Sequence, residues 1–160
     1  MSQSLLPALP CMCGSFRRTA RALTQLYDQA LRPLGLRPTQ FTILQALALA
    51  GRVSQGQLGE LLALDSTTLT RTLELMGRQG WIAARRGKDR RERWLGLSVA
   101  GEKQLNRALP AWEKVQARLR QQLGERAWKN LLQLNHRVTS LATSPNLANP
   151  SQAKNEGGSL

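Results

Sequence analysis

The sequence predicts a mainly α-helical fold with one small β-hairpin. Apolar residues recur every three or four positions through most of residues 16–141, which is the period of a helix. Two short stretches, residues 81–86 and 93–97, flank a charged turn and indicate a pair of returning strands. Three short predicted helices precede this hairpin directly, and that order is typical of a winged helix-turn-helix.

The first two helices are marked by their ends. The first carries an apolar stripe from Phe16 onward and ends at Gly35, because glycine readily adopts the left-handed conformation of a helix C-cap. The second has Pro38 in its first turn, where a missing backbone N–H is tolerated, and it stops at Gly51. Its buried face is predicted to carry Phe41, Leu44 and Leu47.

The third and fourth helices are short. Ser54 and Gln57 form a capping-box pattern, which predicts a third helix that ends near residue 64. Either Asp65 or Ser66 caps the fourth helix, and Gly80 closes it. Its inward face is predicted to carry Leu69, Leu73 and Met76.

Two longer helices follow the hairpin. Ser98 caps the first of them and Gly124 breaks it, and a last helix then reaches about residue 143. Both carry apolar stripes that are too extensive to face water, so they pack either on a second subunit or on each other as an intramolecular hairpin. The stripes consist of Leu105, Leu109, Trp112, Val115, Leu119 and Leu123, then Trp128, Leu131, Leu134, Val138 and Leu141.

The chain is strongly basic. It has 23 Lys and Arg against 10 Asp and Glu, a net charge of +13 and a pI near 11.5. Such an excess predicts attraction to a polyanion, although a solvated basic surface with no specific partner would give the same total. The clustering favours nucleic acid, because six of the basic residues lie between positions 85 and 93.

The predicted DNA contacts come from the fourth helix and the hairpin. Hydroxyl groups can form hydrogen bonds with base edges and phosphates, and arginine can donate two hydrogen bonds to guanine. Arginine is also attracted into narrow minor grooves, and Asp89 is expected to orient Arg91 by a charge-assisted bond. The alternative is a solvated hairpin beside an ordinary amphipathic helix. The predicted contacts are Ser66, Thr67, Thr68, Thr70, Arg71 and Arg78 on the helix, and Arg85, Arg86, Lys88, Asp89, Arg90, Arg91 and Arg93 on the hairpin.

Several segments of residues 11–143 together carry a specific resemblance. They are residues 34–41 (LGLRPTQF), 53–62 (VSQGQLGELL), 64–71 (LDSTTLTR) and 80–82 (GWI), then Asp89-x-Arg91, Leu95-x-Leu97-Ser98 and Gly101. In these segments the chain resembles the MarR family. The resemblance implies a homodimer that binds double-stranded DNA at a pseudo-palindromic operator, with the fourth helices in successive major grooves and Arg91 at the tip of each minor-groove wing. It also implies a dimer interface built from the first, fifth and sixth helices.

These expectations divide the chain into three parts. Residues 37–104 form the winged helix-turn-helix DNA-binding region, and residues 11–36 and 105–143 form a helical dimerisation region. Residues 144–160 are rich in Ser, Pro, Asn and Gly and are expected to be a disordered tail. The longest mostly apolar stretch, residues 41–50, is far shorter than the roughly 20 residues that span a bilayer. With no recognisable signal peptide either, we expect a cytoplasmic repressor without a membrane partner.

Cys11 and Cys13 are the only cysteines and are expected to be reduced at rest. Cys13 lies in the first turn of the first helix with Arg17 one turn on, and both the helix N-terminus and the guanidinium favour a reactive thiolate. Together with Tyr27 this is similar to the OhrR-type, hydroperoxide-sensing branch of the family. However, Pro38 stands where that branch has a second tyrosine, and no cysteine near the C-terminus can act as a resolving thiol. The alternatives are apolar filling of the dimer interface and a metal site with two thiolates per subunit.

The family resemblance also implies a ligand pocket, because small phenolic or aromatic acids release many members from DNA. It would lie where the dimerisation helices meet the DNA-binding region, near Phe16, Tyr27 and Phe41. A nearby basic residue, such as Arg17 or Arg21, would hold the carboxylate of such an acid. The same residues also suit plain core or surface roles.

An enzyme is not expected. The three Asp, seven Glu and one His show no acid-base spacing, and no phosphate loop, zinc pattern or nucleophile elbow is present, so no cofactor is predicted. A thiol peroxidase that uses Cys13 is the enzymatic alternative. A nonspecific basic nucleic-acid binder is the other alternative, although the few aromatic residues provide no base-stacking platform.

Overall fold

The computed structural model describes residues 10–86 and 93–144. Within these ranges the chain forms α-helices, one 3-10 turn and a three-stranded antiparallel sheet, which confirms the predicted mainly helical fold with a small hairpin. The helical elements are α1 (Met12–Leu31), η1 (Arg32–Leu34), α2 (Pro38–Ala50), α3 (Gln55–Leu62), α4 (Ser66–Arg78), α5 (Val99–Leu123) and α6 (Glu125–Ala142). The strands are β1 (Val53–Ser54), β2 (Ile82–Arg86) and β3 (Arg93–Leu97).

The helix starts follow the predicted caps. The Ser54 hydroxyl accepts a hydrogen bond from the backbone N–H of Gln57 at 3.2 Å, and the Gln57 side-chain oxygen accepts one from the Ser54 N–H at 2.9 Å. Of the two candidates for α4, Asp65 is the cap, and its carboxylate accepts from the backbone N–H of Thr68 at 2.8 Å. Hydrogen bonds from the side chain and backbone of Thr68 hold the pKa of Asp65 below its usual value. Ser98 caps α5 as predicted.

Two details differ from the sequence-based expectation. The helix α1 ends at Leu31 rather than at Gly35, because Pro33 has no N–H for the next helical hydrogen bond and the chain continues as the tighter η1 turn. Gly35 still closes this segment in the left-handed conformation, with a φ of 76°. The sheet also has a third strand that the sequence analysis missed. This strand, β1, pairs Val53 with Leu95 and is too short to show an alternating pattern.

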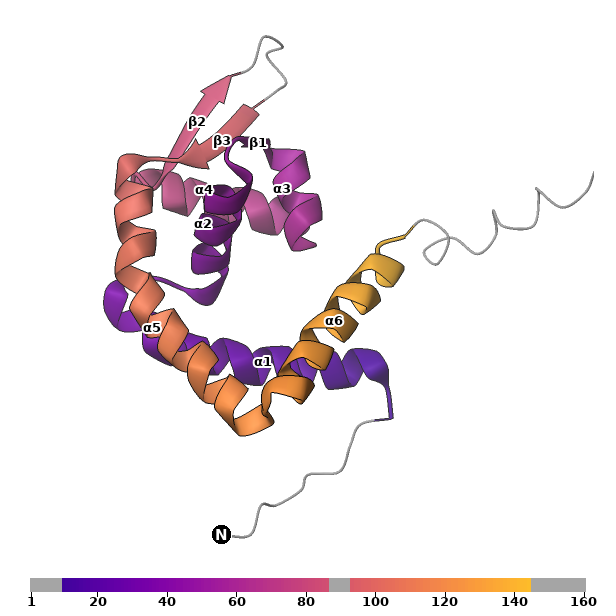
Figure 1. The fold of residues 1–160 in the computed structure, drawn as a ribbon. Coiled ribbons are helices and arrows are strands. Elements are labelled where there is room, and N and C mark those ends of the chain that lie inside the picture. The colour runs from indigo at the N-terminus through magenta and orange to yellow at the C-terminus, as the bar shows by residue number, and fades with distance from the viewer. Residues whose placement is uncertain (1–9, 87–92, 145–160) are drawn as a thin grey trace, which may run out of the picture.

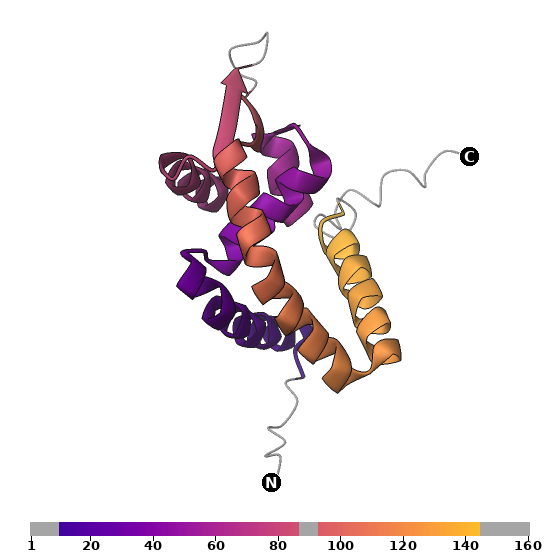
Figure 2. The same ribbon diagram turned by 60° about the vertical axis from the view of Figure 1, so that its left-hand side comes forward.

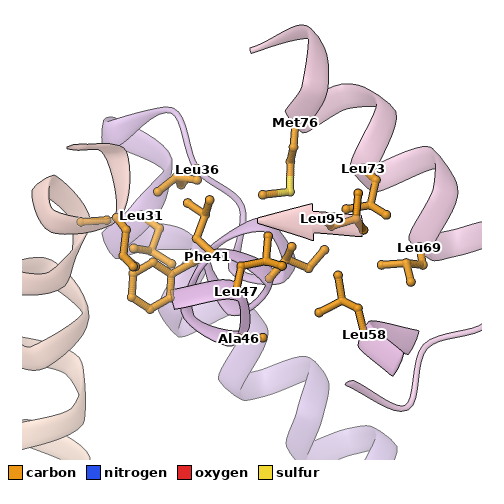
Figure 3. Packing of buried hydrophobic residues seen from close by; sticks show 14 residues of the cluster. Leu31, Leu36, Phe41, Ala46, Leu47, Leu58, Leu69, Leu73, Met76 and Leu95 are labelled. Carbon is orange, nitrogen blue, oxygen red and sulfur yellow. The ribbon is translucent and has the colours of Figure 1, made fainter. Parts of the chain in front are cut away.

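The hydrophobic core lies between α2, α3, α4 and the sheet (Figure 3), and it extends to Leu31 at the end of α1 and to Leu105 and Ala108 of α5. The strand order is β1-β3-β2, so β3 is central, and its Leu95 is only 1% exposed. The predicted inward faces of α2 and α4 are confirmed, because all their members are buried in this cluster. The most deeply buried side chains include Leu31, Leu36, Ile43, Leu44, Leu47, Leu58, Leu69, Met76 and Leu95.

The helices α2, α3 and α4 gather with the sheet in one part of the molecule (Figure 1). The long α5 runs from this part past α1 and then turns into α6, which stands apart from α1 (Figure 2). The chain turns back from α5 into α6 at Gly124, as predicted. In the described ranges, every helix is too short or too polar to cross a membrane.

Candidate nucleic-acid interface

The outward face of α4 gathers most of the helix residues that were predicted to contact DNA. Three apolar residues of this helix are buried in the core, so its opposite side faces solvent. The α4 helix begins at Ser66, at one end of this face, and the unpaired backbone N–H groups of a helix N-terminus favour phosphate oxygens. The exposed predicted residues are Ser66, Thr67, Thr68, Arg71 and Arg78.

Thr70 is the member of this set that faces another helix. Its hydroxyl accepts a hydrogen bond of 2.8 Å from the side-chain amide of Gln55, and Thr70 is only partly exposed. Gln55 is the first residue of α3, so this bond joins the start of α3 to the middle of α4. Gln55 is not predictable from the sequence, because nothing in a linear pattern shows which residue of α3 approaches α4.

The base of the hairpin is described, and its tip is not. The register of β2 and β3 places Arg85 opposite Trp94 and Arg86 opposite Arg93, and the side chain of Arg85 is exposed. Arginines therefore stand on the strands that carry the predicted wing. The other predicted wing residues, Lys88, Asp89, Arg90 and Arg91, lie outside the described residues, and their roles stay predictions.

The two cysteines lie at the start of α1. Cys11 is its N-cap residue and Cys13 lies in its first turn, and both thiols are free and exposed. Arg17 is exposed one turn further on. Tyr27 lies on the same helix, fourteen residues after Cys13, so the two are about 21 Å apart along one subunit at 1.5 Å per residue. Among the described residues, no group of three or more His, Cys, Asp or Glu side chains is placed to hold a metal ion.

A pocket of about 420 Å³ lies between α1, α2 and α5. Of the predicted pocket residues, Tyr27 and Phe41 line it, whereas Phe16 and Arg17 do not. The pocket also includes Trp112, whose ring lies 5.8 Å from that of Phe41 between centroids, at an angle of 38°. Burial raises the pKa of Tyr27, so its hydroxyl stays protonated at neutral pH. The remaining lining residues are Ala20, Leu23, Thr24, Leu31, Pro38, Thr42, Gln45 and Gln116.

A cluster of charges lies where α1 meets η1 and α2. The carboxylate of Asp28, a buried residue of α1, accepts hydrogen bonds from Arg32 and from Arg37. The bond from Arg32 Nε is 2.9 Å long, and Nη1 of Arg37 lies 2.9 and 3.1 Å from the two carboxylate oxygens. Arg37 is the N-cap residue of α2, so Asp28 joins the first helix to the DNA-binding region. Hydrogen bonds from Arg37, then from Arg32, hold the pKa of Asp28 below its usual value.

Comparison with known proteins places this arrangement among characterised folds. The sequence model of the MarR family matches residues 34–92. The crystal structure of the M. tuberculosis transcriptional regulator MosR, in complex with DNA, is 35% identical to this chain. That similarity covers 82% of this chain and 98% of the MosR chain, with a TM-score of 0.71. The chain belongs to the MarR family.

Further relatives agree with the MarR-family assignment. A probable transcriptional regulator from Pseudomonas aeruginosa is 26% identical, with coverage of 81% of this chain and 97% of that one and a TM-score of 0.72. YwoH, an uncharacterised HTH-type transcriptional regulator of Bacillus subtilis, is 30% identical over 86 residues, which are 54% of this chain and 63% of YwoH. The match thus spans less than two thirds of YwoH. MarR-family proteins are transcriptional regulators, which confirms the expectation that the chain is not an enzyme.

Proposed function

We propose that this MarR-family protein binds double-stranded DNA sequence-specifically as a homodimer, and that it represses transcription by occupying a pseudo-palindromic operator in the cytoplasm. The observation that carries the proposal is the outer face of α4. There, hydroxyl groups and the guanidinium of Arg71 are exposed, while the inner face is fixed in the core. The MosR relative was crystallised with DNA, which supports the same ligand for this chain.

The two predicted contact surfaces would bind different parts of the duplex. The α4 helix would lie in the major groove, where Arg71 can donate two hydrogen bonds to guanine and the threonine hydroxyls can contact bases or phosphates. The arginines of β2, β3 and the turn between them would add minor-groove and phosphate contacts. These phosphate contacts release counterions, so the affinity should fall steeply as salt rises.

Helix α6 supports the homodimer. None of its residues is buried in the single chain. Even its large apolar side chains are exposed, with Leu131, Leu134 and Leu141 at 38%, 53% and 54%. At the start of α1, Phe16 is also 40% exposed. Apolar surface of this extent marks an interaction site, and a hairpin of α5 with α6 leaves it uncovered. A second copy would cover it and, by twofold symmetry, present a second α4 to the duplex.

The experiment is an anisotropy titration with a duplex taken from immediately upstream of the protein's own gene. We expect binding that survives excess random duplex, with a preference of at least roughly a thousandfold and a steep salt slope. Arg71→Ala should weaken operator binding by roughly tenfold or more, and Arg91→Ala should weaken it without unfolding the protein. Arg118→Ala, at an exposed position of α5, is the matched control and should bind like the wild type.

The same titration distinguishes the alternatives. If random competitor erases the binding, the protein is a nonspecific basic DNA binder rather than an operator-binding repressor. An Arg71→Ala variant with wild-type affinity would contradict the placing of α4 in the major groove.

We also propose that an effector releases the repressor from DNA. The pocket between α1, α2 and α5 borders both the predicted dimerisation helices and the DNA-binding region, so an occupant touches both. The alternative trigger is oxidation of Cys13 by a hydroperoxide, which the exposure of its thiol favours. A preformed operator complex that loses affinity on addition of a pocket ligand would support the first mechanism. Loss of affinity on addition of a hydroperoxide would support the second.

A further inference from the structure

A second pocket, of about 340 Å³, lies where the end of α2 and the start of α5 meet the sheet. The register of β2 and β3 places Ala83 opposite Gly96, and two small residues thus form its floor. Arg85 and Trp94 form the next pair of this register and lie on the same face of the sheet. Leu95 points to the other face and is buried in the core, so the pocket lies on the outer face of the sheet.

Two arginines border this pocket. Arg85 stands on β2, and Arg52 follows α2 with its Cγ 3.7 Å from the position that a Cβ would take on Gly96. Both residues are exposed, and within residues 10–86 and 93–144 neither guanidinium forms a hydrogen bond or an ion pair. The planar fork of a guanidinium matches the oxygens of a phosphate and can donate two hydrogen bonds to them. The pair therefore favours a phosphate group as the anion in this pocket.

Two further groups of the lining suit a flat base. Trp94 is partly exposed and offers an aromatic surface, on which nucleic-acid bases stack through their π faces. Glu102, in the first turn of α5, offers carboxylate oxygens that only accept hydrogen bonds, and it forms no ion pair within the described ranges. The amino group of a base can donate to such a carboxylate. A ligand with a phosphate at one end and an amino-bearing base at the other therefore matches the charged and aromatic groups of the pocket.

We propose that this pocket binds a nucleoside monophosphate. The phosphate accepts hydrogen bonds from Arg52 and Arg85, and the base stacks on Trp94 with its amino group directed to Glu102. A phosphate monoester carries about two negative charges at neutral pH, which the two guanidinium groups balance. The volume lies within the range of small-molecule sites, roughly 300–1,000 Å³. Only one consequence rests on the proposed function: Arg85 is also a predicted DNA contact, so the nucleotide and DNA compete for it.

The test compares three probes on the full chain without DNA, by titration calorimetry at physiological salt. AMP carries both the base and the phosphate, adenosine lacks the phosphate, and ribose 5-phosphate has the charge of AMP without the base. We expect AMP to bind with a dissociation constant of roughly 0.1 mM or below, the scale of a ligand of this size. Adenosine should bind at least roughly tenfold more weakly, because it loses the charge-assisted hydrogen bonds. Ribose 5-phosphate should also bind at least roughly tenfold more weakly, because it loses the stacking.

Three variants locate the site. Arg52→Gln removes one guanidinium and should weaken AMP binding by roughly tenfold, with adenosine unaffected. Arg118→Gln removes the same charge at an exposed position of α5 and should bind AMP like the wild type. Gly96→Ala adds a Cβ 3.7 Å from Cγ of Arg52 and 3.9 Å from the carbonyl oxygen of Gly51, which are ordinary contacts, so the sheet should form normally. Because the methyl group narrows the floor of the pocket, this variant should weaken AMP and adenosine alike. Circular dichroism checks that all three variants fold.

Each result decides the inference. It is overturned if AMP does not bind, or if Arg52→Gln and Arg118→Gln bind AMP equally. Equal binding of ribose 5-phosphate and AMP would also overturn it, because a basic protein attracts any anion of that charge. AMP binding that depends on Arg52 but leaves operator affinity unchanged would uphold the site and contradict the competition for Arg85. Absence of specific DNA binding by the wild type without nucleotide would contradict the proposed function alone.

Discussion

The side-chain amide of Gln55 donates a hydrogen bond of 2.8 Å to the hydroxyl of Thr70 and so joins the first turn of α3 to α4. The bond uses the Thr70 oxygen as an acceptor and leaves its O–H free to donate. Gln55 therefore limits the positions that this hydroxyl, a predicted DNA contact, can take at the edge of the exposed face of α4. Gln55 is a positioning residue by this argument, because it acts on DNA through Thr70.

Gln55→Met should reduce the preference for operator over random duplex by roughly threefold to tenfold, because one partly buried hydrogen bond is lost. Thr70→Val should have a similar effect, and the double variant should be no worse than the stronger single one, since both changes remove the same interaction. Competition anisotropy measures all three. Gln25→Met, at an exposed position of α1, is the control. Strictly additive effects of the two changes would contradict the positioning role.

Asp28 should make stability depend on pH in the acid range. Its pKa is lowered by hydrogen bonds from Arg37 and Arg32, so the folded protein binds this proton less readily than the unfolded chain. The stabilisation is therefore complete above the ordinary value of 3.8 and is lost as pH falls through the lower folded value. Asp28→Asn should lower the melting temperature at pH 7, and the gap to the wild type should close at strongly acid pH.

Thermal unfolding followed by circular dichroism across this pH range measures the effect. Glu113→Gln removes an exposed carboxylate from α5 and serves as the control, with little change expected at any pH. A gap between Asp28→Asn and the wild type that is the same at all pH values would show that the ionised carboxylate is not what stabilises the junction.

Local signals explain why most of the fold could be predicted from the sequence. The capping box of Ser54 and Gln57 needs only residues three apart, and Gly51 ends α2 because its φ of 71° suits glycine. The inward stripes of α2 and α4 follow from the helical period alone. The two-residue β1 has no such signal, because its pairing with β3 depends on residues about forty positions away.

Contacts between distant elements explain what the sequence analysis missed at the site. Gln116 lies on a helix whose apolar period is visible, but that period does not show that its amide oxygen is buried without a partner. The bond from Arg37 to Asp28 crosses the η1 turn and nine positions, and helical spacing predicts only the contact with Arg32, four positions away. Phe16 and the basic residue Arg17 lie close to the expected pocket in the sequence, yet neither residue lines it.

Leu134→Asp should separate the proposed dimer. Leu134 is 53% exposed on α6, and a charge there would be buried without a partner if a second copy covers this face. Analytical ultracentrifugation should show a dimer for the wild type and a monomer for the variant at the same concentration. Leu49→Asp makes the same change at an 89% exposed position at the end of α2 and should remain dimeric. A dimeric Leu134→Asp variant would exclude this part of α6 from the interface.

Cys13→Ser tests whether the thiol at the start of α1 senses hydroperoxides. The Cys13 thiolate would attack the peroxide O–O bond, giving a sulfenic acid on the protein and releasing the alcohol, and added thiol would reduce the sulfenic acid back to the thiol.

In the wild type, hydroperoxide should lower operator affinity by roughly fivefold or more, the scale of common allosteric couplings, and thiol should restore it. Cys13→Ser should keep full affinity under peroxide, and Cys11→Ser is the matched control that should still respond. Tyr27 of the same subunit lies about 21 Å away along the helix, so any help from a tyrosine requires the dimer. A wild-type response in Cys13→Ser would remove the sensor role and leave ligand binding between α1, α2 and α5 as the proposed trigger.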